Sequence, residues 1–358
     1  MPEKHEIYMQ RAIELATRGV GNASPNPMVG AVLVHEGKVI GEGWHKEYGL
    51  AHAEVNCLDS VAEEDKQLIP DSTMYVNLEP CAHHGKTPPC AVRLINERVK
   101  EVIVANEDPF AEVDGKGFEL LRKNHIRTEQ GILEKQGLWL NRRFFCFHQN
   151  RRPYIILKWA QTAEGYFAPL DRSRYQITNN TSRQLLHKWR TEESAILIGY
   201  QTALNDNPEL TARLYTGRQP LRIVFDRTLQ LPATNNVFNG AAPTWVINDK
   251  TDRQEGNIRF VRIRFNENPL VQILEKLHEA NILSLIVEGG AQLLDSFILE
   301  GLWDEARVFT GQASMSEGVH APLLTNFKKA FDAELSGDVL NVYVSKGSRY
   351  KYIQGMEL

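Results

Sequence analysis

The 358-residue chain has no apolar run that approaches the ~20 residues needed to span a bilayer. Its amino terminus carries charges of both signs and lacks the apolar core of a signal peptide. It has only four cysteines, and its net charge of -4 argues against a broad electropositive surface for nucleic acid. We therefore expect a cytoplasmic protein without membrane or nucleic-acid partners, whose cysteines are thiols or metal ligands.

Internal repeats, low-complexity segments and the G-x-G-x-x-G motif are also absent, so the sequence carries no Rossmann dinucleotide fingerprint. A hydrophobic fraction of 42% and a charged fraction of 24% are ordinary for a globular protein. Since domains commonly span ~100–200 residues, the length favours two of them.

Strands and helices alternate along both halves of the chain. In the first half we expect helices over residues 3–18, 91–98 and 133–147, a short helix near His52, a β-hairpin over 30–40, and strands over 73–78 and 102–105. In the second half we expect strands over 154–159, 195–198, 221–225, 244–247 and 284–288, and helices over 182–190, 269–280 and 291–300. The segment 149–153 interrupts the pattern, which predicts two layered α/β domains, 1–148 and 149–358.

The most specific motif combines His52-Ala53-Glu54 with Pro80-Cys81 and Cys90. It is similar to the H-x-E…P-C-x-x-C signature of zinc deaminases. One imidazole and two thiolates can hold Zn²⁺ and leave a fourth position for water, whose pKa the metal lowers from ~15.7 to ~7. The motif therefore predicts His52, Cys81 and Cys90 as metal ligands, and Glu54 as the catalytic group that carries the proton.

The spacing of the cysteines departs from that signature, because Cys90 follows Cys81 by nine positions instead of three. Residues 79–90 read Glu-Pro-Cys-Ala-His-His-Gly-Lys-Thr-Pro-Pro-Cys. This stretch resembles the motif Glu-Pro-Cys-x-His-x-Gly-[Lys/Arg]-Thr-Pro-Pro-Cys in the deaminase domain of the bifunctional riboflavin-biosynthesis enzymes. A structural zinc site, with His83 or His84 as a fourth ligand, is the alternative interpretation.

A second stretch, Pro25-Asn26-Pro27-Met28-Val29-Gly30, matches the Asn-Pro-x-Val-Gly element of the same family. The resemblance implies substrate contacts at Asn26, His45, His83 and Lys86. An asparagine amide offers both a donor and an acceptor to an aminopyrimidinone edge. Lysine and histidine would supply charge for a ribose phosphate.

The second half resembles the reductase domain of this family, which has a dihydrofolate-reductase-like fold and uses NADPH. The matching stretches occur in family order at 153–160, 177–178, 195–202, 205–213 and 287–290. The resemblance implies a catalytic role for Lys158, where a cation would assist hydride delivery. It implies substrate contacts at Arg174, Arg190, Asp206, Leu210, Arg213 and Glu288, and cofactor contacts at Ala160, Gln176, Thr202, Arg227, Gly290, Ala291 and Gln292.

This half also departs from the family pattern. Residues 162–165 read Thr-Ala-Glu-Gly where the family usually has Ser-Leu-Asp-Gly, and Gln176 replaces a tryptophan. Arg174 or, with a slip of one residue, Ser173 stands where the family often has a serine that contacts substrate. These changes leave open how this loop contacts nicotinamide and ribose.

The resemblance implies a cytidine-deaminase-like three-layer α/β/α domain followed by a dihydrofolate-reductase-like α/β domain, with Zn²⁺ and NADPH as cofactors. It implies deamination of 2,5-diamino-6-(5-phosphoribosylamino)pyrimidin-4(3H)-one and reduction of the resulting uracil, so the partner is a small phosphorylated pyrimidine. We also expect a homo-oligomer. The alternatives are a zinc nucleic-acid deaminase with a C-terminal binding module, and a non-catalytic zinc-stabilised domain in which Glu54 has no purpose. Acidic net charge argues against the first.

Overall fold

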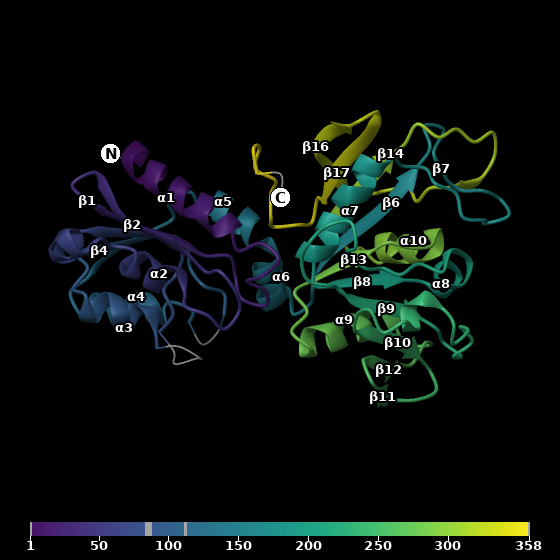
Figure 1. Ribbon diagram of the computed structural model, residues 1–358, viewed down its shortest axis with the longest axis horizontal. Helices are drawn as coiled ribbons and strands as arrows, with labels where there is room; N and C mark the ends of the chain where they lie inside the picture. Colours follow the sequence, from purple (N-terminus) through teal and green to yellow (C-terminus); the bar gives the residue numbers. More distant parts are fainter. Residues whose placement is uncertain (1, 83–87, 111–112, 357–358) are drawn as a thin grey trace. The chain divides into compact units, whose positions relative to one another are not determined.

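A computed structural model describes residues 2–82, 88–110 and 113–356 of the chain (Figure 1). The chain divides into two units, which we describe separately. The first runs to Asn150 and includes the segment from Tyr350 onward, and the second is Arg151–Arg349. The boundary expected between residues 148 and 149 lies within the last helix of the first unit, α6 (Arg142–Asn150).

The C-terminal segment contacts the first unit through specific side chains. The indole N–H of Trp139 donates to the Met356 carbonyl at 2.9 Å, and the Tyr352 ring meets Trp139 edge-on at 5.6 Å. The Tyr350 hydroxyl lies 3.2 Å from the Gln149 side-chain oxygen. No local pattern in residues 350–356 indicates this return, because it depends on partners more than two hundred positions away.

The first unit is built on a five-stranded sheet with the order β2-β1-β3-β4-β5, in which β1 pairs antiparallel with both neighbours and β3, β4 and β5 are parallel. Its strands are β1 (Gly30–His35), β2 (Lys38–Trp44), β3 (Thr73–Leu78), β4 (Glu101–Asn106) and β5 (Arg127–Gln130). Its helices are α1 (Pro2–Thr17), α2 (Ala53–Asp59), the 3-10 helix η1 (Glu63–Asp71), α3 (Cys90–Asn96), α4 (Lys116–Lys123), α5 (Glu134–Leu140) and α6.

Alternate side chains of these strands fill two cores, one on each face of the sheet. Ala31 and Leu33 of β1 pack with α2, α3 and α4, whereas Val32 and Val34 pack with α1 and α5. Figure 1 shows α1 and α5 on one face and α2, α3 and α4 on the other. The result is the three-layer α/β/α arrangement that the sequence predicts.

The helix expected over 133–147 is instead two helices, α5 and α6, which meet at Asn141. Asn141 has backbone angles of φ -97° and ψ 23°, outside the helical range. Its amide is used elsewhere: it accepts from the Met28 N–H at 2.8 Å and donates to the Met28 carbonyl at 2.9 Å. A tertiary contact therefore interrupts a stretch whose periodicity is helical throughout.

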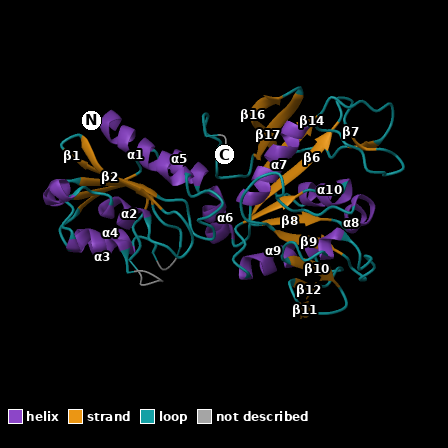
Figure 2. Ribbon diagram, in the orientation of Figure 1, coloured by secondary structure: helices purple, strands orange, loops and turns teal. Residues whose placement is uncertain are grey.

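The second unit is built on a ten-stranded sheet with the order β11-β12-β10-β9-β8-β13-β6-β14-β17-β16 (Figure 2). Its core strands are parallel, and β11, β17 and β16 are antiparallel additions at the two edges. The strands are β6 (Tyr154–Gln161), β8 (Ala195–Ile198), β9 (Leu221–Phe225), β10 (Thr244–Asn248), β11 (Arg253–Glu255), β12 (Ile258–Arg262), β13 (Ser284–Val287), β14 (Glu305–Thr310), β16 (Phe327–Leu335) and β17 (Asp338–Ser345).

Helices and a small separate sheet complete this unit. One core lies between the sheet and the helices α9 and α10, and a second lies on the opposite face around Ile196, Val224 and Val246. The helices are α7 (Asn180–Glu192), α8 (Tyr200–Asp206), the 3-10 helix η2 (Asn236–Phe238), α9 (Pro269–Glu279) and α10 (Ala291–Leu299), and the small sheet pairs β7 (Tyr166–Ala168) with β15 (Val319–His320).

The sequence pattern misses several of these elements. It assigns no strand after residue 288, yet β14, β16 and β17 extend the large sheet. For β14 the reason is its polarity. This strand buries Glu305 and Arg307, which are hydrogen-bonded to each other at 2.6 Å, so its sequence lacks the apolar run that predicts a buried strand. Among the described residues, no helix is both long enough and apolar enough to cross a membrane.

Candidate active sites

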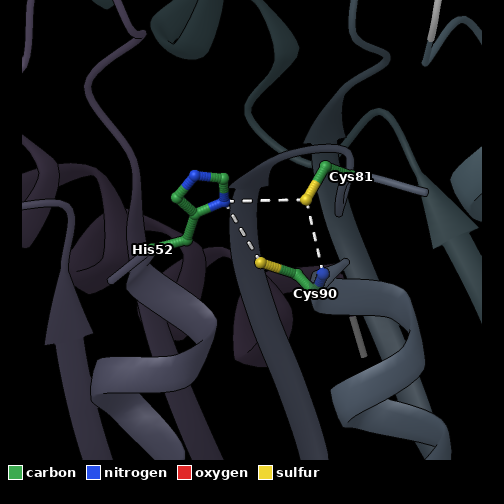
Figure 3. Close-up of side chains that lie close together, drawn as sticks. All are labelled: His52, Cys81 and Cys90. Carbon is green, nitrogen blue, oxygen red and sulfur yellow. Dashed lines mark hydrogen bonds between the residues drawn. The ribbon is translucent and has the colours of Figure 1, made fainter. Parts of the chain in front are cut away.

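The first site brings His52, Cys81 and Cys90 together near the carboxyl end of β3, the central strand of the first sheet (Figure 3). His52 is the residue before α2, Cys90 is the first residue of α3, and Cys81 follows the end of β3. The His52 Nδ1 lies 3.3 Å from the Cys90 sulfur and 3.6 Å from the Cys81 sulfur. All three ligand atoms lie within 4.8 Å of one another.

The electrostatics of this cluster favour a thiolate and a nearby cation. Hydrogen bonding from the Cys90 thiol, together with the contribution of His52, lowers the pKa of Cys81 to about 4. The pKa of His52 is raised, mainly by its hydrogen bond with Cys81. The backbone N–H of Cys90 also donates to the Cys81 sulfur at 3.3 Å. One imidazole and two thiols in this geometry fit the donor set of a catalytic zinc.

Glu54 lies two residues beyond His52 on the first turn of α2, and it is only 3% exposed. Burial raises the pKa of this carboxyl to about 7, and the negative charge of Cys81 adds to the effect. A carboxyl with that pKa can both accept and return a proton near neutral pH. The arrangement therefore places a carboxyl group that could exchange protons near neutral pH close to the three ligands.

Asn26 and His45 form a polar chain that leads to the cluster. The Asn26 amide nitrogen lies 3.1 Å from the His45 Nε2, and the His45 ring meets the His52 ring edge-on at 5.3 Å. Burial lowers the pKa of His45, so it is neutral near pH 7. His83 and Lys86, the other expected substrate contacts, lie outside the described residues.

The loop that carries Asn26 is held by two buried asparagines. Asn141 makes the two bonds to Met28 described above, and Asn77 donates to the Met28 carbonyl at 3.0 Å. Asn77 also accepts from the Gly30 N–H at 2.8 Å. At Gly30 an added Cβ would lie 2.0 Å from the Ala12 carbonyl, so only glycine lets α1 approach here.

Asp108 is an acidic neighbour of this site that follows β4. It is 7% exposed, and its carboxylate accepts from the Phe110 N–H at 2.8 Å. Burial raises its pKa to about 7, with additions from the charges of Glu79 and Cys81.

The second site is a cavity of about 310 Å³ in the second unit. It draws together residues that lie up to 130 positions apart in the sequence. Nine of the expected substrate, cofactor and catalytic residues line it: Lys158, Ala160, Arg174, Gln176, Arg190, Thr202, Asp206, Leu210 and Glu288.

Lys158, Arg190 and Glu288 form the charged centre of this cavity. Arg190 and Glu288 make a two-pronged ion pair at 3.0 and 2.8 Å, and their side chains are 9% and 8% exposed. Burial alone would raise the pKa of Glu288, but Arg190 and Lys158 hold it below its ordinary value. Burial lowers the pKa of Lys158, and Glu288 opposes the shift. Burial therefore makes the Lys158 proton easier to release, while Glu288 stabilises the charged form.

The loop after α8 supplies another wall. Leu210 is buried and has a φ of 56°, a left-handed conformation that costs a leucine about 1 kcal/mol or more. The carbonyl on each side of it is held by a guanidinium: Arg222 donates to Glu209 at 3.2 Å and Arg190 donates to Thr211 at 3.1 Å. The cavity wall is therefore preorganised by two arginines.

A glycine turn precedes α10 on the expected cofactor side. Gly290 has a φ of 70°, and a Cβ added there would lie 3.3 Å from the Thr202 hydroxyl. At Gly289 an added Cβ would lie 2.9 Å from the Thr202 methyl. Bare backbone beside a threonine hydroxyl at a helix start suits a phosphate group, so these residues fit a nucleotide cofactor.

Five expected contacts lie outside this cavity lining. Gly290, Ala291 and Gln292 are at the start of α10. Arg213 is 3.5 Å from Glu209 with 43% of its side chain exposed. Arg227 pairs with Asp249 at 2.9 Å and has 62% of its side chain exposed.

The cavity and its surroundings also include residues that sequence reasoning missed. Arg172 and Arg183 line it, and His187 receives the Leu214 N–H at 3.4 Å. Arg183, His187 and Arg190 recur on α7 at intervals of four and three residues, which places them on one face. That spacing is visible in the sequence and would have identified the set.

Comparisons with known proteins match both units. The model of the cytidine and deoxycytidylate deaminase zinc-binding region matches residues 2–106, and the model of the RibD C-terminal domain matches residues 153–314. Together they support a zinc-dependent deaminase unit followed by a reductase unit.

Relatives and solved structures cover most of the chain. Riboflavin biosynthesis protein RibD of Aquifex aeolicus is 42% identical over 87% of this chain and 88% of its own length, and that of Escherichia coli is 34% identical over 85% and 86%. The structure of Acinetobacter baumannii RibD has a TM-score of 0.88 at 32% identity, covering 96% of this chain and 99% of that chain.

A Thermotoga maritima protein described as a diaminohydroxyphosphoribosylaminopyrimidine deaminase/5-amino-6-(5-phosphoribosylamino)uracil reductase has a TM-score of 0.87 at 32% identity, covering 96% of this chain and 99% of that chain. These matches confirm the predicted fold class. The chain therefore belongs to the RibD family of bifunctional riboflavin-biosynthesis enzymes, which join a zinc-binding deaminase domain to a reductase domain.

Proposed function

We propose that the chain deaminates 2,5-diamino-6-(5-phosphoribosylamino)pyrimidin-4(3H)-one and then reduces 5-amino-6-(5-phosphoribosylamino)uracil to its ribitylamino form with NADPH. The description of the Thermotoga maritima relative names both activities. The observation that carries the proposal is the juxtaposition of the buried Glu54 with the His52, Cys81 and Cys90 cluster. A structural zinc site needs no such carboxyl.

In the deamination step, His52, Cys81 and Cys90 would hold zinc, which supplies activated water at neutral pH when bound. Glu54 would take one proton from the attacking water and pass it to the ring nitrogen. It would then take the remaining proton from the hydroxyl group added to the ring carbon and pass it to the amine, so that ammonia leaves and a carbonyl remains. The Glu54 pKa of about 7 suits both transfers. Asn26 and His45 would orient the pyrimidine, and His83 and Lys86 stay in the proposal as contacts predicted from the sequence.

In the reduction step, NADPH would supply hydride to C1 of the opened ribose. Lys158 would deliver the accompanying proton, and Glu288, which is paired with Arg190, would stabilise the charged lysine. Arg174, Asp206, Leu210 and Arg213 would bind the substrate together with this pair.

On the cofactor side we propose contacts at Ala160, Gln176, Thr202, Arg227, Gly290, Ala291 and Gln292. Preference for NADPH over NADH, a homo-oligomeric state and a cytoplasmic location rest on the sequence and remain predictions.

The test is Glu54→Gln in the full chain, with zinc content and ammonia release measured together. We expect about one zinc per chain and a loss of deamination of at least ~10²–10⁴-fold, because the proton carrier is removed while the ligands remain. NADPH oxidation with the deaminated intermediate should be unchanged and serves as the internal control. Near-normal ammonia release would refute the assignment, and loss of zinc would identify Glu54 as a ligand.

A further inference from the structure

The carboxylate of Glu79 accepts hydrogen bonds from four backbone N–H groups in a stretch of the first unit that begins 29 positions later, at Asp108. It accepts from Asp108 at 3.2 Å, Gly115 at 3.1 Å, Gly117 at 2.8 Å and Phe118 at 3.3 Å. Its side chain is 3% exposed. We call these five residues the Glu79 clamp.

The Glu79 clamp caps α4 from outside the helix. The first N–H groups of a helix have no partner within it, and the N-cap residue Gly115 supplies no side-chain bond. A carboxylate in this position satisfies the donors and meets the positive end of the helix dipole. The cap is provided by the chain segment that leads from β3 to Cys81.

The same contacts tie the start of α4 to the zinc-binding cluster. A Cβ added at Gly117 would lie 2.1 Å from the Pro80 carbonyl, so the helix packs directly on the residue before Cys81. On its other side α4 packs against α3, which begins with Cys90. The first turn of α4 is therefore packed against the chain segment that leads into Cys81.

We propose that Glu79 is a positioning residue for deamination, which holds Asp108 and the first turn of α4 against the strand end that carries Cys81. This inference rests on the proposed deaminase function and adds a residue to it. Asp108 is the acidic residue that the clamp places, since its backbone N–H donates to Glu79, which precedes Cys81 by two residues. If Glu79 acts through Asp108, the two residues share one effect on catalysis.

The test uses Glu79→Gln in the full, zinc-loaded chain. A glutamine keeps the shape but has one acceptor oxygen, so its NH₂ faces some of the four N–H donors. We expect kcat/KM for deamination to fall roughly 10–100-fold, since a displacement of ~1 Å at an active site has effects of this size. Zinc content, the visible spectrum of the cobalt(II)-loaded protein and NADPH-dependent reduction should not change.

The distinguishing measurement is a double-mutant cycle with Asp108→Asn. If Glu79 acts by placing Asp108, Glu79→Gln should have little further effect on kcat/KM in an Asp108→Asn background. A structural role independent of Asp108 would instead make the two losses multiply. Gly117→Ala, whose added Cβ would lie 2.1 Å from the Pro80 carbonyl and 2.9 Å from a Glu79 carboxylate oxygen, disturbs both contacts of the clamp and should reproduce the loss.

Glu101→Gln is the matched control, because Glu101 is a carboxylate on β4 that bonds to Thr73 and Arg127 and not to the clamp. It should deaminate normally. Normal kcat/KM in Glu79→Gln, multiplying effects in the cycle, or an altered cobalt spectrum would each overturn the inference. If the unmodified chain released no ammonia, the proposed function would fail and this inference with it.

Discussion

Asn141 offers a sharp test of how the first unit holds its substrate loop. Asn141 is 3% exposed, and its side chain bonds to both backbone groups of Met28. It accepts from the Met28 N–H at 2.8 Å and donates to the Met28 carbonyl at 2.9 Å. Asn77 provides a second donor to that carbonyl but no acceptor for the Met28 N–H. Asn141→Ala therefore leaves the N–H without its partner and the carbonyl with one donor.

The cost can be estimated from these contacts. An unsatisfied buried donor costs ~1–3 kcal/mol, and the lost bond to the carbonyl adds roughly 1 kcal/mol. The free energy of unfolding of the first unit should thus fall by about 2–4 kcal/mol. For a unit of this size each kcal/mol lowers the Tm by roughly 2–4 °C. Because Met28 lies two residues from Asn26, KM for deamination should also rise.

Calorimetry and ammonia release on the full chain would measure both effects, with NADPH oxidation as the internal reference. Asn124→Ala is the matched control, since Asn124 caps the end of α4 with one exposed bond to Leu120 at 2.8 Å. It should change stability by less than about 0.5 kcal/mol. An Asn141→Ala variant with the Tm and KM of the unmodified chain would show that these bonds do not hold the loop.

Three further outcomes are expected. Trp139→Phe removes the hydrogen bond to the Met356 carbonyl and should lower the free energy of unfolding of the first unit by about 1 kcal/mol, measured by calorimetry. An unchanged free energy of unfolding would mean that this contact of the C-terminal segment does not stabilise the unit. Arg213→Ala should raise KM for reduction about ten- to a hundredfold while sparing deamination, and an unchanged KM would make it a surface charge. Burial and the charge of Arg190 lower the pKa of His187 from 6.5 to about 4. As the pH falls, this imidazole is therefore protonated in the unfolded chain at a higher pH than in the folded chain. Stability of the second unit to denaturant should therefore fall between pH 6.5 and 4, and His187→Gln should flatten that slope.

The sequence alone determined what depends on residues close together in the chain. The motifs around His52, Cys81 and Cys90 predict a zinc site because these residue types are zinc ligands, and their resemblance to a deaminase family predicts the chemistry. Hydrophobic periodicity located most strands and helices of both units, since burial of one face imposes a local pattern. Residues spread from 153 to 290 likewise predicted the reductase domain.

Only the tertiary structure decided what depends on distant partners. It broke the helix expected over 133–147 at Asn141, whose amide is used by Met28, and it added the polar strand β14 to the large sheet. It also brought the C-terminal segment back to Trp139. The hydrogen bonds from Glu79 that cap α4 also depend on distant residues. A buried polar group needs a hydrogen-bond partner, and residues far away in the sequence can provide it.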